Sequence, residues 1–146
     1  MNLVGRPCTL RPFSTDGIAL PRKMDMAVVA RAFHNAVEDE LRRAGMGVRL
    51  AGPKDANEQI VVSGSFVKVT PGNRWKRYFA PFLGGAPAIV EVKGLVTHQK
   101  IPLEELSGMG KRGLGPLGGK SMDMLRGAAE TAGIQLARQA VETLAG

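Results

Sequence analysis

The feature that most constrains the fold is a change of hydrophobic period along the chain. Between Arg22 and Ala44, apolar residues recur every three or four positions, so they share one stripe of a helix while the charged residues lie opposite. Gly45 follows this stripe and suits the left-handed conformation that ends many helices. The spacing therefore predicts an amphipathic helix with a buried stripe of Met26, Val29, Ala30, Phe33, Val37, Leu41 and Ala44.

Segments with alternating or β-branched apolar residues predict strands on both sides of this helix. They are residues 8–13, a short stretch through Val48 and Leu50, residues 59–69 and residues 88–97. Gly64 marks a bulge or a close approach within the third of these. The segment 98–100 has the character of a turn, and the glycines that follow exclude an ordinary helix over residues 107–120.

The final segment again has the helical period. Ser121 is suited to cap the start of a helix, and one face carries Met122, Leu125, Ala129, Ala132, Leu136 and Ala140. Ile134 and Val141 lie away from that face and are candidates for contact with a second copy of the chain. These elements predict an α/β fold of the α+β type: a two-layer sandwich in which two amphipathic helices cover one face of a mostly antiparallel sheet.

The length and charge of the chain limit its organisation and partners. A chain of 146 residues fits a single domain over residues 1–146, with a core of about 6–145. The formal net charge of +7 favours an acidic protein surface, an anionic envelope component or a nucleic acid as partner. Cys8 is the single cysteine, so no internal disulfide can form, and its place in an alternating strand predicts a buried thiol. No transmembrane helix or signal peptide is evident, which predicts a cytoplasmic protein if the chain is complete as given.

A basic run interleaved with aromatic residues is the most conspicuous candidate binding surface. It consists of Arg74, Trp75, Lys76, Arg77 and Tyr78, within a stretch from Gln59 to Val90 that has no acidic residue. Cations and stacking rings together suit anionic partners, including single-stranded nucleic acid. The other interpretation, that the rings pack inward and the cations are only solvated, stays open.

Motifs for catalysis are weak. The run from Gly115 to Ser121 ends like a phosphate-binding loop, but Leu114 stands where that loop needs a glycine. A weaker interpretation is an anion site at Lys120 and Ser121, at the start of the last helix. Neither His34 nor His98 has a second histidine or a cysteine at ligand spacing. The sequence therefore predicts a non-enzymatic protein without a metal or cofactor.

One ordered pattern resembles a known family. A β-strand, a Pro-Gly turn, a basic link, a glycine-rich stretch and another strand follow each other in the runs Val61–Tyr78, Phe82–Ala86 and Val90–Val92. The pattern resembles the bacterial domain of unknown function 4410, in order over about residues 8–145. The resemblance implies a small α/β domain that is often exported and sometimes a lipoprotein, with a fold similar to periplasmic domains of the curli secretion lipoprotein. It favours an envelope-associated binding or assembly module. The alternative is a basic domain that binds single-stranded nucleic acid.

Overall fold

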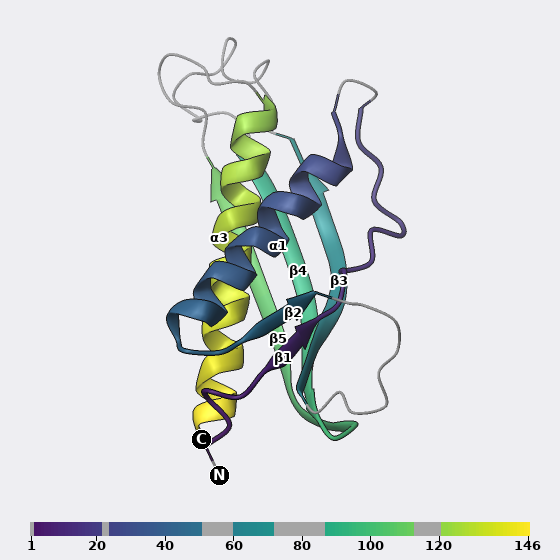
Figure 1. The fold of residues 1–146 in the computed structure, drawn as a ribbon. Helices are drawn as coiled ribbons and strands as arrows, with labels where there is room; N and C mark the ends of the chain where they lie inside the picture. The colour runs from purple at the N-terminus through teal and green to yellow at the C-terminus, as the bar shows by residue number, and fades with distance from the viewer. Residues whose placement is uncertain (1, 22–23, 51–59, 72–86, 113–120) are drawn as a thin grey trace.

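A computed structural model describes residues 2–21, 24–50, 60–71, 87–112 and 121–146 of the chain (Figure 1). Its elements follow one another as β1 (Cys8–Leu10), α1 (Met26–Arg43), β2 (Val48–Leu50), β3 (Ile60–Thr70), β4 (Ala88–His98), β5 (Ile101–Arg112) and α3 (Ser121–Ala145). Both helices and the four strands expected from the sequence are present. The fifth strand, β5, includes part of the glycine-rich stretch to which the sequence assigned no regular element.

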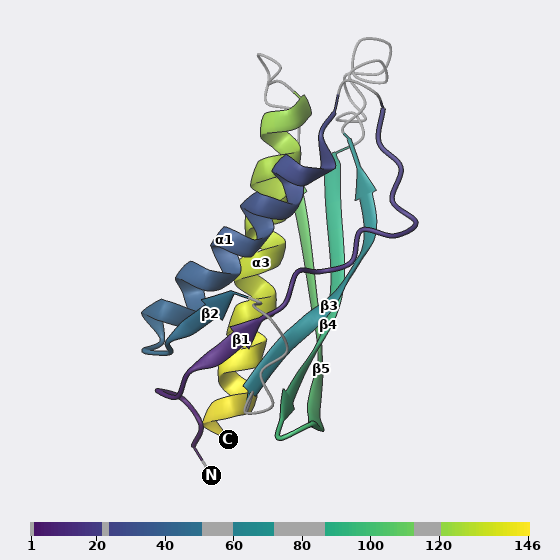
Figure 2. The ribbon, with the colours of Figure 1, turned by 45° about the vertical axis from the view of Figure 1, so that its right-hand side comes forward.

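The five strands form one open mixed sheet in the order β2-β1-β3-β4-β5. The long strands β3, β4 and β5 pair antiparallel, whereas the short β1 is parallel to both of its neighbours. Both helices lie on the same side of the long strands (Figures 1 and 2). The α+β sandwich predicted from the hydrophobic periods is therefore confirmed. The strand order places β2 and β5 at the two edges of the sheet.

Local signals in the sequence explain where α1 begins and ends. The carboxylate of Asp25 accepts a hydrogen bond from the backbone N–H of Ala27 and caps the first turn. Gly45 has a φ of 91°, the left-handed conformation expected of the residue after the helix. Val29, Phe33, Val37 and Leu41 are buried, as the stripe predicted.

Close packing of α3 against β5 accounts for the glycines that interrupt the apolar pattern. A Cβ atom at Gly108 would overlap the carbonyl oxygen of Ala132, and one at Gly110 would overlap that of Ala128. The glycines thus let the helix approach the strand through its alanine face. Gln99 and Lys100, with φ angles of 51° and 68°, form the turn that joins β4 to β5.

The hydrophobic core includes residues from both ends of the chain. It extends from Leu3 to Leu144 and includes the inner faces of β3 and β4 together with both helices. The backbone N–H of Leu3 donates to the carbonyl of Leu144 at 2.7 Å, so the termini lie side by side (Figure 2). Within the described segments, no helix is long and apolar enough to cross a membrane.

Candidate functional site

The predicted basic and anion-binding surfaces fall largely outside the described residues. Arg74, Trp75, Lys76, Arg77 and Tyr78 all lie there, as does Lys120. Ser121 is the first residue of α3, but its side chain is likewise outside the described part. These assignments therefore stay predictions.

The two histidines lie in different surroundings. His34, on α1, is partly buried among the rings of Phe13, Phe33 and Phe66. Its Nε2 accepts a hydrogen bond from the backbone N–H of Phe13 at 2.9 Å. Burial lowers the pKa of His34, and a backbone hydrogen bond with Ala30 opposes that change. His98 ends β4, and its Nε2 is buried without a hydrogen-bond partner in the described structure.

Cys8 is buried on β1, as predicted. Burial raises the pKa of its thiol to about 11, so it is protonated at neutral pH and is a poor nucleophile. Among the residues that the structure places, no three histidine, cysteine or acidic side chains gather as a metal site.

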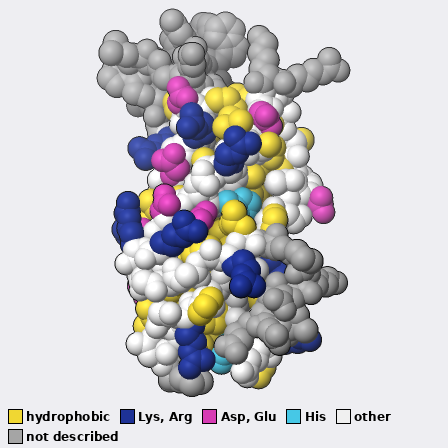
Figure 3. Space-filling model, in the orientation of Figure 1, with side chains coloured by type: hydrophobic (Ala, Val, Ile, Leu, Met, Phe, Trp, Pro, Cys, Tyr) yellow, Lys and Arg dark blue, Asp and Glu magenta, His cyan; other side chains and the backbone are white. Residues whose placement is uncertain are grey.

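An open groove of about 540 Å³ runs between α1 and α3. Val28, Ala32, Ala36 and Ile134 provide its apolar part. Its charged residues carry both signs: Arg31, Asp39, Glu40, Arg43, Arg126 and Glu130. Figure 3, which views the helical face, shows basic and acidic side chains interspersed over it. The groove therefore has no single charge sign that selects an anionic or a cationic ligand.

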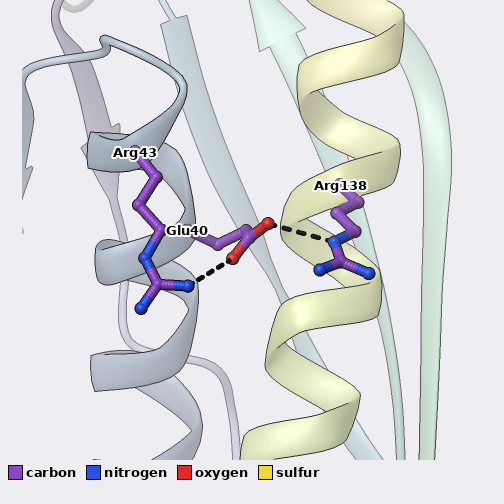
Figure 4. A network of polar contacts seen from close by, with 3 residues as sticks. All are labelled: Glu40, Arg43 and Arg138. Carbon is purple, nitrogen blue, oxygen red and sulfur yellow. Dashed lines mark hydrogen bonds and ion pairs between the residues drawn. The ribbon is translucent and has the colours of Figure 1, made fainter.

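Glu40 joins the two helices across this groove. Its Oε1 accepts a hydrogen bond from Nε of Arg138 at 3.0 Å, and its Oε2 lies 3.8 Å from Nη1 of Arg43 (Figure 4). Ile134 is partly buried in the groove, whereas Val141 is partly buried against the hydrophobic core. The two residues singled out for contact with a second copy therefore do not form one exposed patch.

Exposed apolar side chains concentrate on the two edge strands of the sheet. The large exposed hydrophobic residues are Leu50 on β2, Val67 on β3, and Ile101, Leu103 and Met109 on β5. Leu50 is 57% exposed and Ile101 is 63% exposed, so these side chains keep most of their surface in water. Exposed apolar side chains at a sheet edge are places where another chain can pack.

Two glutamines of α3 cover one half of the β5 edge. The backbone N–H of Met109 donates to Oε1 of Gln135 at 2.9 Å, and that of Ser107 donates to Oε1 of Gln139 at 3.0 Å. Residues 101–105, the first half of β5, are all exposed. The sequence analysis predicted neither β5 nor the hydrogen bonds from its edge to the two glutamines. The available signal was the alternation of Gly108 and Gly110, together with two glutamines spaced one helical turn apart.

Comparison with known proteins identifies the family. The chain matches the model of the domain of unknown function DUF4410 over residues 15–136. It belongs to this family. The family description names no reaction, and no curated protein matches the chain. The resemblance recognised in the sequence is thus confirmed. The matched family is a domain of unknown function, and the comparisons link no enzymatic family to the chain.

Solved structures with low sequence identity share the fold of this DUF4410 protein. The PelC dodecamer from Paraburkholderia phytofirmans is 12% identical, with a TM-score of 0.57, and the match covers 100% of this chain and 91% of that one. Protein XCC0632 from Xanthomonas campestris, described as DUF330, is 10% identical, with a TM-score of 0.53, over 99% of this chain and 84% of that one. At these identities the likeness establishes the fold alone.

Proposed function

We propose that this protein is a non-catalytic assembly module of the bacterial cell envelope and that it works as an oligomer of identical chains. The observation that carries the proposal is the exposure of Ile101, Leu103 and Met109 on the edge strand β5 and of Leu50 on the edge strand β2. Each buried Å² of apolar surface contributes about 25 cal/mol, so association that covers Leu50, Ile101 and Leu103 is favoured. Edge strands also tend to pair with other chains when they are left open.

Two further observations support the proposal. The PelC structure with the same fold is a dodecamer, so this fold is compatible with assembly from many copies. The charged groups of the α1–α3 groove are partly satisfied by one another, as in the contact of 3.8 Å between Glu40 and Arg43. The envelope location rests on the resemblance described for the sequence.

The experiment that tests assembly is measurement of the molar mass in solution. Size-exclusion chromatography with light scattering, over a range of protein concentrations, is expected to give a multiple of the 15.5 kDa chain mass. The same measurement in high salt and in mild detergent distinguishes specific assembly from nonspecific association. A chain that stays monomeric at every concentration would contradict the proposal.

A separate experiment tests whether the basic run binds an acidic protein or an anionic envelope component. Replacing Arg74, Lys76 and Arg77 with alanine is expected to weaken recovery of a native partner without changing the unfolding transition. Unchanged recovery would reject this surface. Binding of single-stranded oligonucleotides that falls steeply with salt would favour the nucleic-acid alternative instead.

A further inference from the structure

The outer side of α1 carries a row of residues with opposite charges at its two ends. Arg31, Asn35 and Asp39 are spaced four residues apart, are all exposed and border the groove between α1 and α3. Eight residues of helix separate Arg31 from Asp39 by about 12 Å, too far for contact with each other. Neither forms an ion pair within the described part of the chain. The row therefore presents a cation and a carboxylate that lack partners, on either side of a neutral centre.

The outer side of α3 carries a second row of the same kind, centred on Ile134. Steps of four residues lead from this centre to an exposed charged residue four times, at Arg126, Glu130, Arg138 and Glu142. Each of these charges is opposite in sign to the one equally far on the other side of Ile134. Glu130 and Glu142 form no ion pair with any described residue.

The two arginines of this second row have contacts within their own chain but remain accessible. Arg126 lies 3.8 Å from Asp123, and Arg138 lies 3.0 Å from Glu40. Their side chains are 53% and 68% exposed, so each guanidinium has donors left for a second carboxylate.

The centres of the two rows lie at the same level of the helical layer. Gly133, next to Ile134 in the chain, packs on α1: a Cβ atom there would lie 3.1 Å from Cβ of Ala36, the neighbour of Asn35. Both helices run from the top to the bottom of the view in Figure 1. A single axis across the layer can therefore pass by both centres.

From these rows we infer that two copies of this protein pack through their helical faces, about a two-fold axis that passes by Asn35 and Ile134. The inference rests on the proposed function, because it is a contact between identical chains. Each helix then lies antiparallel over its own copy, so that Arg31 faces Asp39 of the second copy, and the reverse. On α3 the same overlay pairs opposite charges at every charged position of the row. Parallel packing of a helix on its own copy would bring like charges together instead.

The other residues of this face are compatible with the overlay. Ile134 meets its own copy at the axis, and apolar side chains of α1 line the groove beside it: Val28, Ala32 and Ala36. Arg42 and Arg43 already contact carboxylates of their own chain. The antiparallel overlay places them opposite residues 27 and 28 of the second copy, which carry no charge, so they add no repulsion.

Exchanging the two charges of α1 tests this contact. Arg31→Asp sets two carboxylates against each other, and Asp39→Arg sets two cations against each other. Each variant alone is expected to raise the dissociation constant of the assembly about tenfold or more. A mixture of the two variants, or a chain with both substitutions, restores opposite charges and is expected to return that constant to near the wild-type value. Sedimentation velocity over a series of concentrations measures it.

Lys93→Asp is the matched control. Lys93 is exposed on β4 next to the buried Val92, so it lies on the face of the sheet away from the helices. The substitution changes the net charge as much as Arg31→Asp does and is expected to leave the dissociation constant unchanged. Equal effects of these two substitutions would overturn the inference. So would a mixture of Arg31→Asp and Asp39→Arg that associates no better than either variant alone.

Cysteine cross-linking tests the position of the axis. Asn35→Cys places a thiol beside its own copy, so mild oxidation is expected to give a covalent dimer, while Cys8, which is 2% exposed, is retained. Ala27→Cys is the control on the same exposed row. Its eight-residue distance from the axis separates the two copies of residue 27 by about 24 Å, so it is expected not to link. Linking at residue 27 in place of residue 35 would overturn this register.

The outcomes separate this inference from the proposed function. In a preparation that light scattering shows to be oligomeric, charge variants that associate like the wild type would overturn the helical contact and leave the assembly function standing. Failure of Asn35→Cys to link in such a preparation would have the same meaning. A chain that is monomeric at every concentration would overturn both.

Discussion

The backbone N–H of Phe13 donates to Nε2 of His34 at 2.9 Å, and this contact ties the segment after β1 to α1. It requires that Nε2 carry no proton. Aromatic rings surround the imidazole, with the Phe33 ring centroid at 5.3 Å and the Phe13 centroid at 5.8 Å. Protonation of His34 would therefore remove a hydrogen-bond acceptor and place a charge in apolar surroundings.

The first prediction is that the folded state loses stability in mild acid through His34. The pKa of His34 is lowered in the fold by burial, below its ordinary value of 6.5. When the pH falls through 6.5, the unfolded chain therefore takes up a proton that the folded chain does not. The contribution of His34 to the free energy of unfolding therefore decreases as the pH falls from 6.5 to the pKa of His34 in the folded state. Below that pKa this contribution no longer changes. Urea unfolding at a series of pH values measures this.

Two variants distinguish His34 from other acid effects. His34→Gln keeps an oxygen that can accept from Phe13 but does not titrate, so its unfolding free energy is expected to change less over the same pH range. His98→Gln leaves the Phe13 contact intact and serves as the matched histidine substitution. An identical profile for wild type and His34→Gln would show that His34 is not responsible.

Much of the fold could be predicted because its signals are local. The period of the residues from Met26 to Leu41 specifies a buried stripe whatever lies beyond it, and Asp25 and Gly45 mark the ends of that helix within a few residues. The alternation of Val90, Val92 and Val96 likewise specifies one buried face of β4. Such patterns depend on a single element and its own geometry.

β5 and the edge surfaces could not be predicted in the same way. Pro102 and the glutamates at 104 and 105 argue against a buried strand, and β5 tolerates them because it is an edge. Gly108 and Gly110 weaken a strand in isolation and are explained only by α3, which follows later in the chain. Which half of the edge is covered depends on glutamines more than twenty residues away.

The second prediction is that Gly110→Ala destabilises the fold. A methyl group at this position would overlap the carbonyl oxygen of Ala128, so α3 would have to move away from β5. Overpacking of this kind costs about 1–3 kcal/mol. Gly47→Ala is the control, because its Cβ would meet only Cα of Pro7, at an ordinary 3.8 Å. Equal urea midpoints for the two variants would contradict the close packing of α3 on β5.

The third prediction concerns Glu40 and Arg138. The side chain of Glu40 is 16% exposed, whereas that of Arg138 is 68% exposed, so solvent screens the pair from one side. A double-mutant cycle with alanine is expected to give a coupling energy of about 0.2–1 kcal/mol, decreasing with salt. Removing Glu40 is expected to destabilise more than removing Arg138, because Glu40 also lies near Arg43. A coupling that does not respond to salt would contradict this solvent-screened description.

The last prediction is that Gln135 and Gln139 protect the edge of the sheet. Replacing both with alanine removes the acceptors for the backbone N–H groups of Ser107 and Met109, and each lost hydrogen bond costs about 0.5–1.5 kcal/mol. The freed edge would also be open to pairing along its whole length, so light scattering during prolonged incubation is expected to rise above that of the wild type. Glutamate at the same two positions retains a carboxylate oxygen as acceptor and is expected to keep scattering low. If the alanine and glutamate variants scatter alike, the edge is protected by something other than these hydrogen bonds.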